Sequence, residues 1–203
     1  MRTYVSQRDK LLDAAEQLFA HHGVHAASIR DITSAAQSNL ASINYHFGSK
    51  QNLVRAVLHR RAQPINAERF RLLDEVEANY AESAPPLDRI LRAFLAPAIP
   101  LLQTHPHALC FVGRLLTEHD PALRTMIDEE FHPVLSRFTT AIHRALPGFT
   151  QEQVLLSLRF TVGAMLFVWI TRDPNDSDPT TVVDRLVHFA TTGFQSQIQG
   201  ASS

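Results

Sequence analysis

The 203-residue sequence contains a single cysteine, Cys110, and only seven glycines. One thiol excludes an intramolecular disulfide and any zinc site built from several cysteines, and it is consistent with a reducing compartment. Asn-Gly and Asp-Gly are both absent, so the strongest short-range signals of a β-hairpin are missing. Apolar residues recur at helical spacing instead, and the sequence predicts an all-α fold of about nine helices.

The sequence also has few features of a secreted, membrane-bound or catalytic protein. Residues 1–10 have no apolar core, so we expect no signal peptide and a cytoplasmic location. The one long apolar stretch, 154–170, is short for a membrane span and contains Arg159, which predicts a buried helix and no membrane partner. A Gly-rich phosphate loop, a Gly-x-Ser-x-Gly turn and a His-Glu-x-x-His pair are absent. We therefore expect neither an enzyme nor a cofactor.

Charge is unevenly distributed along the chain, although the net charge is only −1. Residues 1–63 carry eight Lys or Arg and four acids, whereas residues 64–203 carry eleven and sixteen. A basic first third joined to an acidic remainder is typical of a small nucleic-acid-binding domain attached to a second domain. We predict domains at 1–60 and 61–203.

The first fifty residues predict a helix-turn-helix that is braced by a longer first helix. That first helix covers 7–22 and ends at Gly23, and a second begins at Ser28, where Ser-Ile-Arg-Asp predicts a capping box. A three-residue turn at 37–39 then leads into a short helix from Leu40, with an apolar stripe at Leu40, Ile43 and Phe47. Three unrelated packing helices are the alternative to this motif.

The polar face of the helix from Leu40 carries Ser42, Asn44, Tyr45 and His46, and it has no acid. Amide and hydroxyl groups without a neighbouring carboxylate suit base edges and phosphates in the major groove of DNA. An ordinary amphipathic surface helix would show the same stripe. Tyr45 could instead pack between helices, and His46 could bond to a carbonyl at the helix end.

Residues 8–58 resemble the N-terminal domain of TetR-type transcriptional repressors. The motifs that carry the resemblance are Leu-x-x-Ala-Ala-x-x-Leu-Phe at 11–19, Gly23, Ser28-Ile29, Ile32, Ala35-Ala36, and Tyr45-His46-Phe47-x-Ser49-Lys50 followed by Leu53. The resemblance implies a homodimer that binds a palindromic operator in double-stranded DNA. The residues that it assigns to DNA contact are Ser28, Asn39, Leu40, Ala41, Ser42, Asn44, Tyr45, His46 and Lys50.

Three further details of this resemblance concern Lys50, the N-terminus and the turn at Gln37. Lys50 would bind phosphate at the start of a fourth helix, where the helix dipole also favours an anion. Arg2, Thr3 and Tyr4 could form a short DNA-binding arm. Gln37 occupies a turn position where the family often has glycine, and a left-handed backbone there would cost on the order of 1 kcal/mol.

The rest of the chain predicts a C-terminal helical bundle. The fourth helix begins at Ser49 and should kink or break near Pro64 before it continues to about Tyr80. Further helices are expected over 87–102, 107–118, 121–131, 133–146, 151–171 and 179–196. Pro133 is expected to separate the helix at 121–131 from the helix at 133–146.

The helices at 151–171 and 179–196 have apolar residues on more than one face. Surplus apolar surface on two C-terminal helices predicts a two-fold dimer that closes as a four-helix bundle, and a monomer with a well-buried central helix is the alternative. The residues assigned to the dimer interface are Leu156, Phe160, Gly163, Phe167, Leu186, Phe189, Ala190 and Gly193.

Large aromatic residues in the C-terminal half could form a plain core or a ligand pocket. The resemblance favours a pocket, because TetR-type proteins usually bind an inducer inside this bundle. The residues assigned to it are Phe94, Phe111, Arg114, Leu115, Phe138, Val162, Met165 and Trp169. Arg114 could meet a carboxylate or phosphate head group, as could Arg159, or Arg114 could pair with Glu118 one turn away.

The ligand class comes from a finer resemblance over residues 39–50 and 60–73. It links the chain to a TetR subgroup that answers to fatty acids or acyl-CoA, and it implies release from DNA by a small apolar, acyl-type ligand. A metal- or other small-molecule-responsive regulator of the same fold is the alternative. His21, His22, His25, His105 and His107 suggest it, but they lie at a helix end or flank Pro106 without a carboxylate cluster, so no metal site is assigned.

Overall fold

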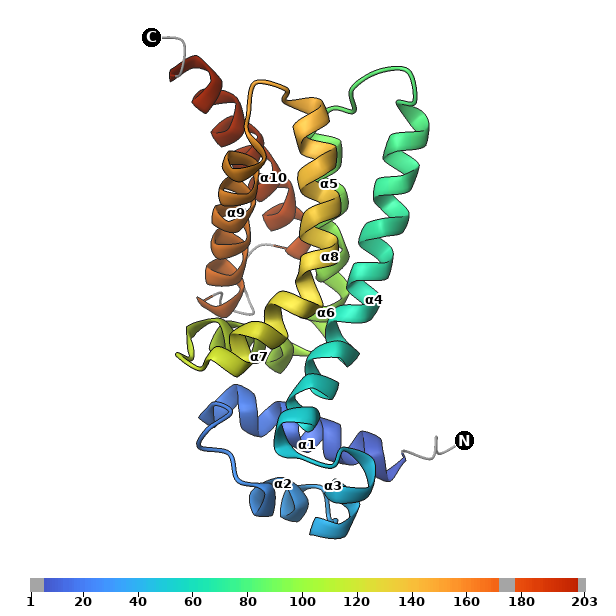
Figure 1. Cartoon of the computed structure of the whole chain (residues 1–203), viewed down its shortest axis with the longest axis vertical. Coiled ribbons are helices and arrows are strands. Elements are labelled where there is room, and N and C mark those ends of the chain that lie inside the picture. Colours follow the sequence, from blue (N-terminus) through green and yellow to red (C-terminus); the bar gives the residue numbers. More distant parts are fainter. Residues whose placement is uncertain (1–5, 172–177, 201–203) are drawn as a thin grey trace. The chain divides into compact units, whose positions relative to one another are not determined.

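The computed structural model describes residues 6–171 and 178–200. Within these ranges the chain forms ten α-helices and one short 3₁₀ helix and has no strand, so the predicted all-α class is confirmed (Figure 1). The fold divides into two compact units. Unit 1 runs to Gln63 and also includes His105–Glu130, whereas unit 2 comprises Pro64–Thr104 and the residues from Phe131 onward. The predicted domain boundary at residue 60 stays a prediction. In the structure, the unit that contains the N-terminal helices also includes His105–Glu130, which the sequence placed in the second domain.

Unit 1 contains four complete helices and the first parts of two others. These are α1 (Gln7–His22), α2 (Ile29–Ala35) and α3 (Leu40–His46), the first part of α4 (Lys50–Asn79), α7 (Pro106–Thr117) and the first part of α8 (Pro121–Ala145). Helix α1 has the predicted bounds, and α2, α3 and α4 follow in the predicted order. Fully buried side chains of the N-terminal helices form the core, and they include Leu11, Leu12, Phe19, Ile32, Ile43, Leu53 and Leu58.

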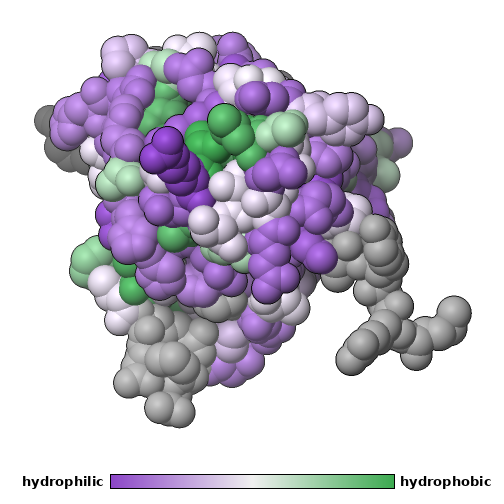
Figure 2. All heavy atoms as spheres, turned by 90° about the horizontal axis from the view of Figure 1, so that it is seen from below, coloured by the Kyte–Doolittle hydropathy of each residue, from purple (hydrophilic) through white to green (hydrophobic). Residues whose placement is uncertain are grey.

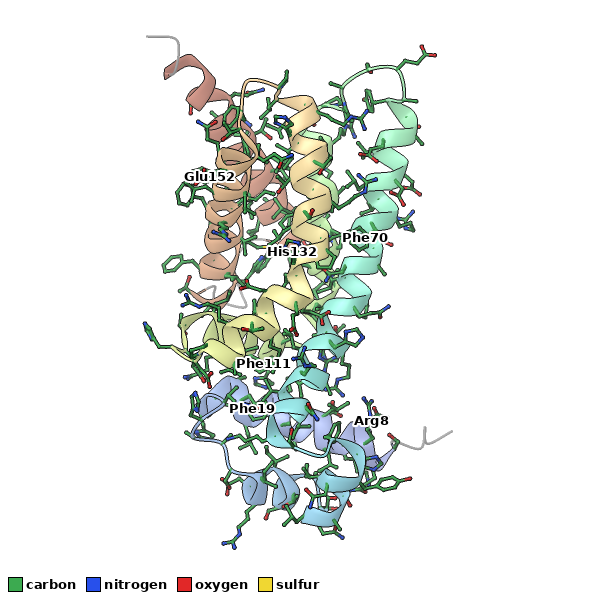
Figure 3. The ribbon with its side chains drawn as sticks, in the orientation of Figure 1. Arg8, Phe19, Phe70, Phe111, His132 and Glu152 are labelled. Atoms are coloured by element: carbon green, nitrogen blue, oxygen red, sulfur yellow. The ribbon has the colours of Figure 1, made fainter. Side chains whose placement is uncertain are left out.

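Helix α7 packs directly on α1. The Phe19 and Phe111 rings stack with their centroids 5.8 Å apart and their planes inclined by 25° (Figure 3). Both rings are fully buried, and Leu115 on α7 is buried as well. Burial of this much apolar surface stabilises the fold by several kcal/mol, at roughly 1.5–3 kcal/mol for each large side chain. Helix α7 is therefore a structural part of the unit that holds α2 and α3.

Unit 2 contains α5 (Leu87–Leu95), the 3₁₀ helix η1 (Ala96–Ala98), α6 (Ile99–Thr104), α9 (Gln151–Thr171), α10 (Pro179–Gly200) and the remaining parts of α4 and α8. Helix α10 lies against both α5 and α9. Aromatic rings hold the core together. Phe94 meets Phe138 with centroids 5.1 Å apart, and Phe149 meets Phe194 at 6.1 Å.

Proline affects the helices less than the sequence predicts. Helix α8 continues through Pro133, so the predicted pair at 121–131 and 133–146 is wrong, and α4 continues through Pro64 without a break. Proline removes one backbone hydrogen bond, but buried side chains recur on both sides of Pro133, from Leu123 to Phe138. Packing along the whole helix outweighs the lost bond. The predicted helix over 87–102 is divided instead, because the chain tightens into η1 around Pro97.

Helix α9 has the predicted bounds but is buried on only one side. Its two apolar rows separate, because Leu158 and Met165 enter the core of unit 2 while Phe160 and Phe167 are 63% and 69% exposed. The alternative of a monomer with a well-buried central helix therefore finds no support, and coverage of the outer row by a second copy stays a prediction. Among the described residues, α9 is the one helix whose length and apolar composition would suffice to cross a membrane.

Candidate nucleic-acid interface

The N-terminus of α3 is fixed by a side-chain cap. Asn39 Oδ1 accepts hydrogen bonds from the backbone amide of Ser42 at 3.0 Å and from the Ser42 hydroxyl at 3.1 Å. This cap satisfies one of the amides that a helix start leaves unpaired and is worth about 1 kcal/mol. Asn39 and Ser42, both predicted to contact DNA, are thus held in defined positions at the start of the helix.

The outer face of α3 projects into solvent. Tyr45 is 85% exposed, so the alternative that its ring packs between helices is wrong, and Ala41 and Asn44 are exposed beside it. Leu40 is 59% exposed and does not belong to the buried stripe, which consists of Ile43 and Phe47. The face therefore carries a large ring, an amide and a hydroxyl, and no acid.

His46 lies beside this face. Its ring meets the edge of the Tyr45 ring, with centroids 4.9 Å apart. It makes no hydrogen bond to a carbonyl within the described residues, so the helix-end alternative is not supported there.

Hydrophilic side chains dominate the surface in Figure 2, which is viewed from the side on which α2 and α3 lie in Figure 1.

The turn between α2 and α3 has the left-handed backbone that was considered for Gln37. Its φ is +49°, which makes Gln37 the one non-glycine residue with positive φ in the described chain. Two backbone hydrogen bonds hold this conformation, from Ser38 to the Thr33 carbonyl at 2.8 Å and from Gln37 to the Ser34 carbonyl at 3.1 Å. This is the bond pattern of a Schellman motif. These local bonds compensate for part of the strain.

Ser28 starts α2 with the predicted capping box. Its Oγ accepts from the Asp31 amide at 3.1 Å, and the Asp31 carboxylate accepts from the Ser28 amide at 3.3 Å and from its hydroxyl at 2.6 Å. These bonds, chiefly the one from the hydroxyl, lower the pKa of Asp31. Because the donors of Ser28 serve its own helix, the phosphate contact at this residue stays a prediction.

Lys50 begins α4 close to the loop that precedes α2. Its Nζ donates to the His25 carbonyl at 3.3 Å, and partial burial lowers its pKa. Ser49 precedes α4 as its N-cap, because its Oγ accepts a hydrogen bond from the Asn52 amide at 3.1 Å. Gly48 ends α3 with a φ of +73°. Arg2, Thr3 and Tyr4, the proposed arm, lie outside the described residues.

The sequence did not reveal how α7 holds the loop between α1 and α2. Arg114 donates from Nε to the Ala20 carbonyl at 2.6 Å and from Nη2 to the His21 carbonyl at 2.9 Å. Glu118 Oε1 accepts from the Val24 amide at 2.8 Å. The Arg114 guanidinium therefore caps the C-terminus of α1, and the predicted pairing of Arg114 with Glu118 is wrong.

The residues predicted to line a ligand pocket fall into two groups. Phe94, Phe138 and Met165 are in the core of unit 2, with Val162 and Trp169 packed against it. Phe111, Arg114 and Leu115 belong to unit 1 and contact α1 or the loop after it. The structure thus brings five of the eight together. Arg69, buried beside Phe94, was missed, although it belongs to the 60–73 segment that carried the finer resemblance.

The predicted dimer residues also separate. The exposed ones are on the outer row of α9 and on α10, namely Leu156, Phe160, Gly163, Phe167 and Phe189. Leu186 and Ala190 are buried in the core of unit 2 itself, so they are not available to a second copy. Gly193 is partly exposed, and a Cβ there would meet no atom within 4 Å.

The histidines that suggested a metal do not assemble into a site. His21 lies against His107, with ring centroids 4.9 Å apart, and His25 pairs with Glu118 and Asp120 instead. In the ranges that the structure describes, no group of three or more His, Cys, Asp or Glu could hold a metal ion.

A capped, exposed recognition helix after a tight turn, on a braced three-helix core, defines a helix-turn-helix DNA-binding protein. The family model "Bacterial regulatory proteins, tetR family" matches residues 11–57, and "Tetracyclin repressor-like, C-terminal domain" matches residues 92–193. The chain therefore belongs to the TetR family of transcriptional regulators, and it is not an enzyme.

Sequence relatives cover parts of the chain. It is 27% identical over 106 residues to the HTH-type transcriptional repressor KstR2 of Mycolicibacterium smegmatis, which covers 52% of this chain and 48% of that one. It is 41% identical over 120 residues to the HTH-type transcriptional repressor Rv3405c of Mycobacterium tuberculosis, which covers 56% and 61%. The chain spans less than half the length of the first curated relatives it matches, between 26% and 48%.

Solved structures share the fold over nearly the whole chain. The ketosteroid transcriptional regulator KstR2 of Mycobacterium tuberculosis superposes with a TM-score of 0.67 at 19% identity, covering 94% of this chain and 96% of that one. The fatty acid degradation regulator FadR from Bacillus halodurans gives a TM-score of 0.64 at 19% identity, covering 95% and 98%. At this identity the likeness establishes the fold.

Proposed function

We propose that the protein is a homodimeric repressor that binds a palindromic operator through α3 and leaves it when a small apolar, acyl-type ligand binds unit 2. The observation that carries the proposal is the outer face of α3, where Asn44 and Tyr45 project into solvent on a helix without an acid. Amides read adenine in the major groove, and hydroxyl groups bind phosphates. Chromosomal DNA as the partner implies a cytoplasmic location.

A two-fold dimer would present two copies of α3 to the DNA. The exposed row of α9, with Phe160 and Phe167, supports this part of the proposal, because contiguous apolar surface of this kind marks interaction sites. Two recognition helices spaced by about 34 Å read half-sites one turn of the duplex apart. The operator is therefore expected to be an inverted repeat.

The apolar core of unit 2 supports the ligand part of the proposal. Phe94, Phe138, Val162, Met165 and Trp169 gather there, and aromatic and aliphatic side chains line most small-molecule sites. The names of two relatives refer to a ketosteroid and to fatty acid degradation, both of which concern largely apolar molecules. A ligand with a large hydrocarbon part is the class that these observations favour.

The test is selection of binding sites from random DNA with the purified full chain, followed by anisotropy titrations against the selected and scrambled duplexes. Asn44→Ala and Tyr45→Ala are expected to lose about tenfold to a hundredfold in affinity for the selected site, since a good base contact is worth roughly 1–3 kcal/mol. Asn79→Ala, an exposed residue at the end of α4, is the matched control. Unchanged binding by both α3 variants, or no preference of the wild type for any sequence, would contradict the proposal.

A further inference from the structure

Arg69 on α4 is buried in the core of unit 2, with 5% of its surface exposed. Its Nε donates to the Phe94 carbonyl at 2.8 Å, and its Nη1 donates to Asn66 Oδ1 at 3.0 Å. The guanidinium carbon lies 4.3 Å from the centre of the Phe94 ring. Asn66 is itself buried, so the amide and the ring together fix the position of the guanidinium.

The charge of Arg69 has no counter-ion in the described parts of the chain. Its two hydrogen-bond acceptors are neutral, and none of the ion pairs between described residues includes it. Burial lowers the pKa of Arg69 to about 10, so the side chain is still charged at neutral pH. Arg61 and Arg137 pair with Glu16 and Glu77. Arg114 also binds only carbonyl oxygens, but it is exposed, whereas Arg69 is the buried arginine among the described residues.

A charge in this position is costly unless something compensates for it. The Phe94 carbonyl is in the last turn of α5, where the helix dipole contributes about half a negative charge, and the ring adds a cation–π contact. Neither supplies a full negative charge. The third guanidinium nitrogen, Nη2, donates no hydrogen bond to an acceptor among the described residues, so it is available to bind an anion. A carboxylate is the anion that matches this planar donor group.

The surroundings of Arg69 are those predicted to receive the ligand. Phe94 lies against both Arg69 and Phe138, and both rings belong to the predicted pocket. We propose that Arg69 binds the carboxylate of an amphipathic carboxylic acid whose hydrocarbon part packs against Phe94 and Phe138. This inference rests on the proposed function, because it names the head group of the ligand of unit 2.

The same geometry separates a free acid from an acyl-CoA. In a thioester the acyl carboxylate is replaced by a neutral carbonyl, and the negative charges are on the distant phosphates of the CoA. Those phosphates need water, whereas Arg69 is inside the unit. A free acid carries its charge where Arg69 can reach it, so the free acid is the form that the site should select.

The experiment compares ligands that differ only in this head group. Dodecanoic acid, methyl dodecanoate and dodecanoyl-CoA, with a steroid carboxylic acid and its methyl ester, are titrated into the full chain while Trp169 fluorescence and release of the selected operator are measured. The wild type is expected to bind each acid about tenfold to a hundredfold more tightly than its ester, the range of a charge-assisted hydrogen bond. Arg69→Met should bind the acid only as well as the ester, with ester binding unchanged. Arg71→Met, an exposed arginine on the same helix, should behave as the wild type.

The remaining outcomes would contradict the assignment of Arg69 as the residue that binds the carboxylate of the ligand. Equal binding of acid and ester by the wild type, or tighter binding of dodecanoyl-CoA, overturns the role of Arg69 but leaves an acyl-responsive repressor. An equal loss of acid and ester binding in Arg69→Met means that Arg69 is only a structural cap of α5. If no probe binds while the operator does, the ligand part of the proposed function fails together with this inference. If Arg69→Met does not fold, Arg69→Lys replaces it: the ammonium keeps the charge but not the planar donor group, so its acid-to-ester ratio should fall below that of the wild type, and an unchanged ratio would contradict the role of Arg69.

Discussion

Glu118 at the end of α7 accepts a 2.8 Å hydrogen bond from the backbone amide of Val24, in the loop that leads to α2. The two residues are 94 positions apart in sequence. Arg114, one turn earlier on α7, binds the last carbonyls of α1. Helix α7 therefore fixes both the end of α1 and the start of the loop, and a shift of α7 must alter the support of the helix-turn-helix.

Gly23→Ala is expected to destabilise the protein by about 2 kcal/mol, because φ of +82° with ψ of +165° is a region that only glycine adopts easily. The new Cβ would also lie 2.7 Å from Glu118 Oε1. Urea unfolding measures the loss, and Gly148→Ala, where a Cβ meets nothing within 4 Å, is the control. The double variant Gly23→Ala/Glu118→Ala separates the contact from the backbone strain. Equal stability of Gly23→Ala and wild type would refute this account of the loop.

Gln37→Gly is expected to stabilise the protein by about 0.5 kcal/mol. Glycine removes the left-handed strain of roughly 1 kcal/mol, and the greater entropy of the unfolded chain offsets part of the gain. Thermal unfolding with a matched Gln63→Gly variant checks the sign, since Gln63 is inside α4 and its replacement should cost about 0.5–1 kcal/mol. A loss at Gln37 as large as that at Gln63 would mean that the Gln37 side chain has a role of its own.

Lys50→Ala is expected to weaken binding to every duplex by a similar factor and to reduce the slope of log affinity against log salt by about one. The reason is that a phosphate contact carries no sequence information. Titrations of the selected and scrambled duplexes at several salt concentrations measure both effects. Arg185→Ala removes an exposed charge from α10 and should change neither. A loss confined to the selected site would assign Lys50 to base recognition instead.

The exposed row of α9 gives a prediction for the oligomer. Phe160→Ser/Phe167→Ser should sediment as a monomer and bind the operator weakly, because both rings are exposed in the single chain. Gly163→Leu should also disturb the dimer, since its Cβ would meet no atom of its own chain within 4 Å. Leu116→Ser changes an exposed leucine of unit 1 and is the control. Unaltered sedimentation of both α9 variants would remove this interface.

Acid should weaken unit 2 through Glu77. The hydrogen bond from Arg137 Nη1 to Glu77 Oε1, 2.8 Å long, is the main reason why the pKa of Glu77 is lowered on folding. A lowered folded-state pKa means stability that is present above the unfolded value and is lost as the pH falls through the folded value. The wild type should therefore lose more stability than Glu77→Gln between about pH 5 and pH 3. Parallel pH profiles would contradict this, and Glu82→Gln, an exposed acid, is the comparison.

Local signals explain why much of the N-terminal fold was predictable. Ser28 with Asp31, Gly23 and the spacing of Leu11 to Phe19 act within a few residues, so sequence alone reveals them. The position of α7 is different. Phe111 and Leu115 have the same apolar spacing whether they pack on α1 or on another helix, and only long-range packing decides between these partners.

Arg69 and Pro133 show two further limits of sequence patterns. A charged residue on α4 predicts a solvent-exposed side chain, and its burial follows from the position of Phe94 on another helix. Pro133 predicts a helix end from its own chemistry, but the apolar residues on both sides of it keep α8 continuous. In both cases tertiary contacts outweigh the local preference.

The chain passes from one unit to the other within α4, between Gln63 and Pro64, and within α8, between Glu130 and Phe131. Each crossing is within three residues of a proline, which cannot donate to the carbonyl four residues earlier. Arg60 and Glu129 therefore have main-chain oxygens that lack an intrahelical partner. Bending α4 near Pro64 or α8 near Pro133 therefore breaks one backbone hydrogen bond fewer than bending elsewhere in the same helix. We expect either helix to bend there first.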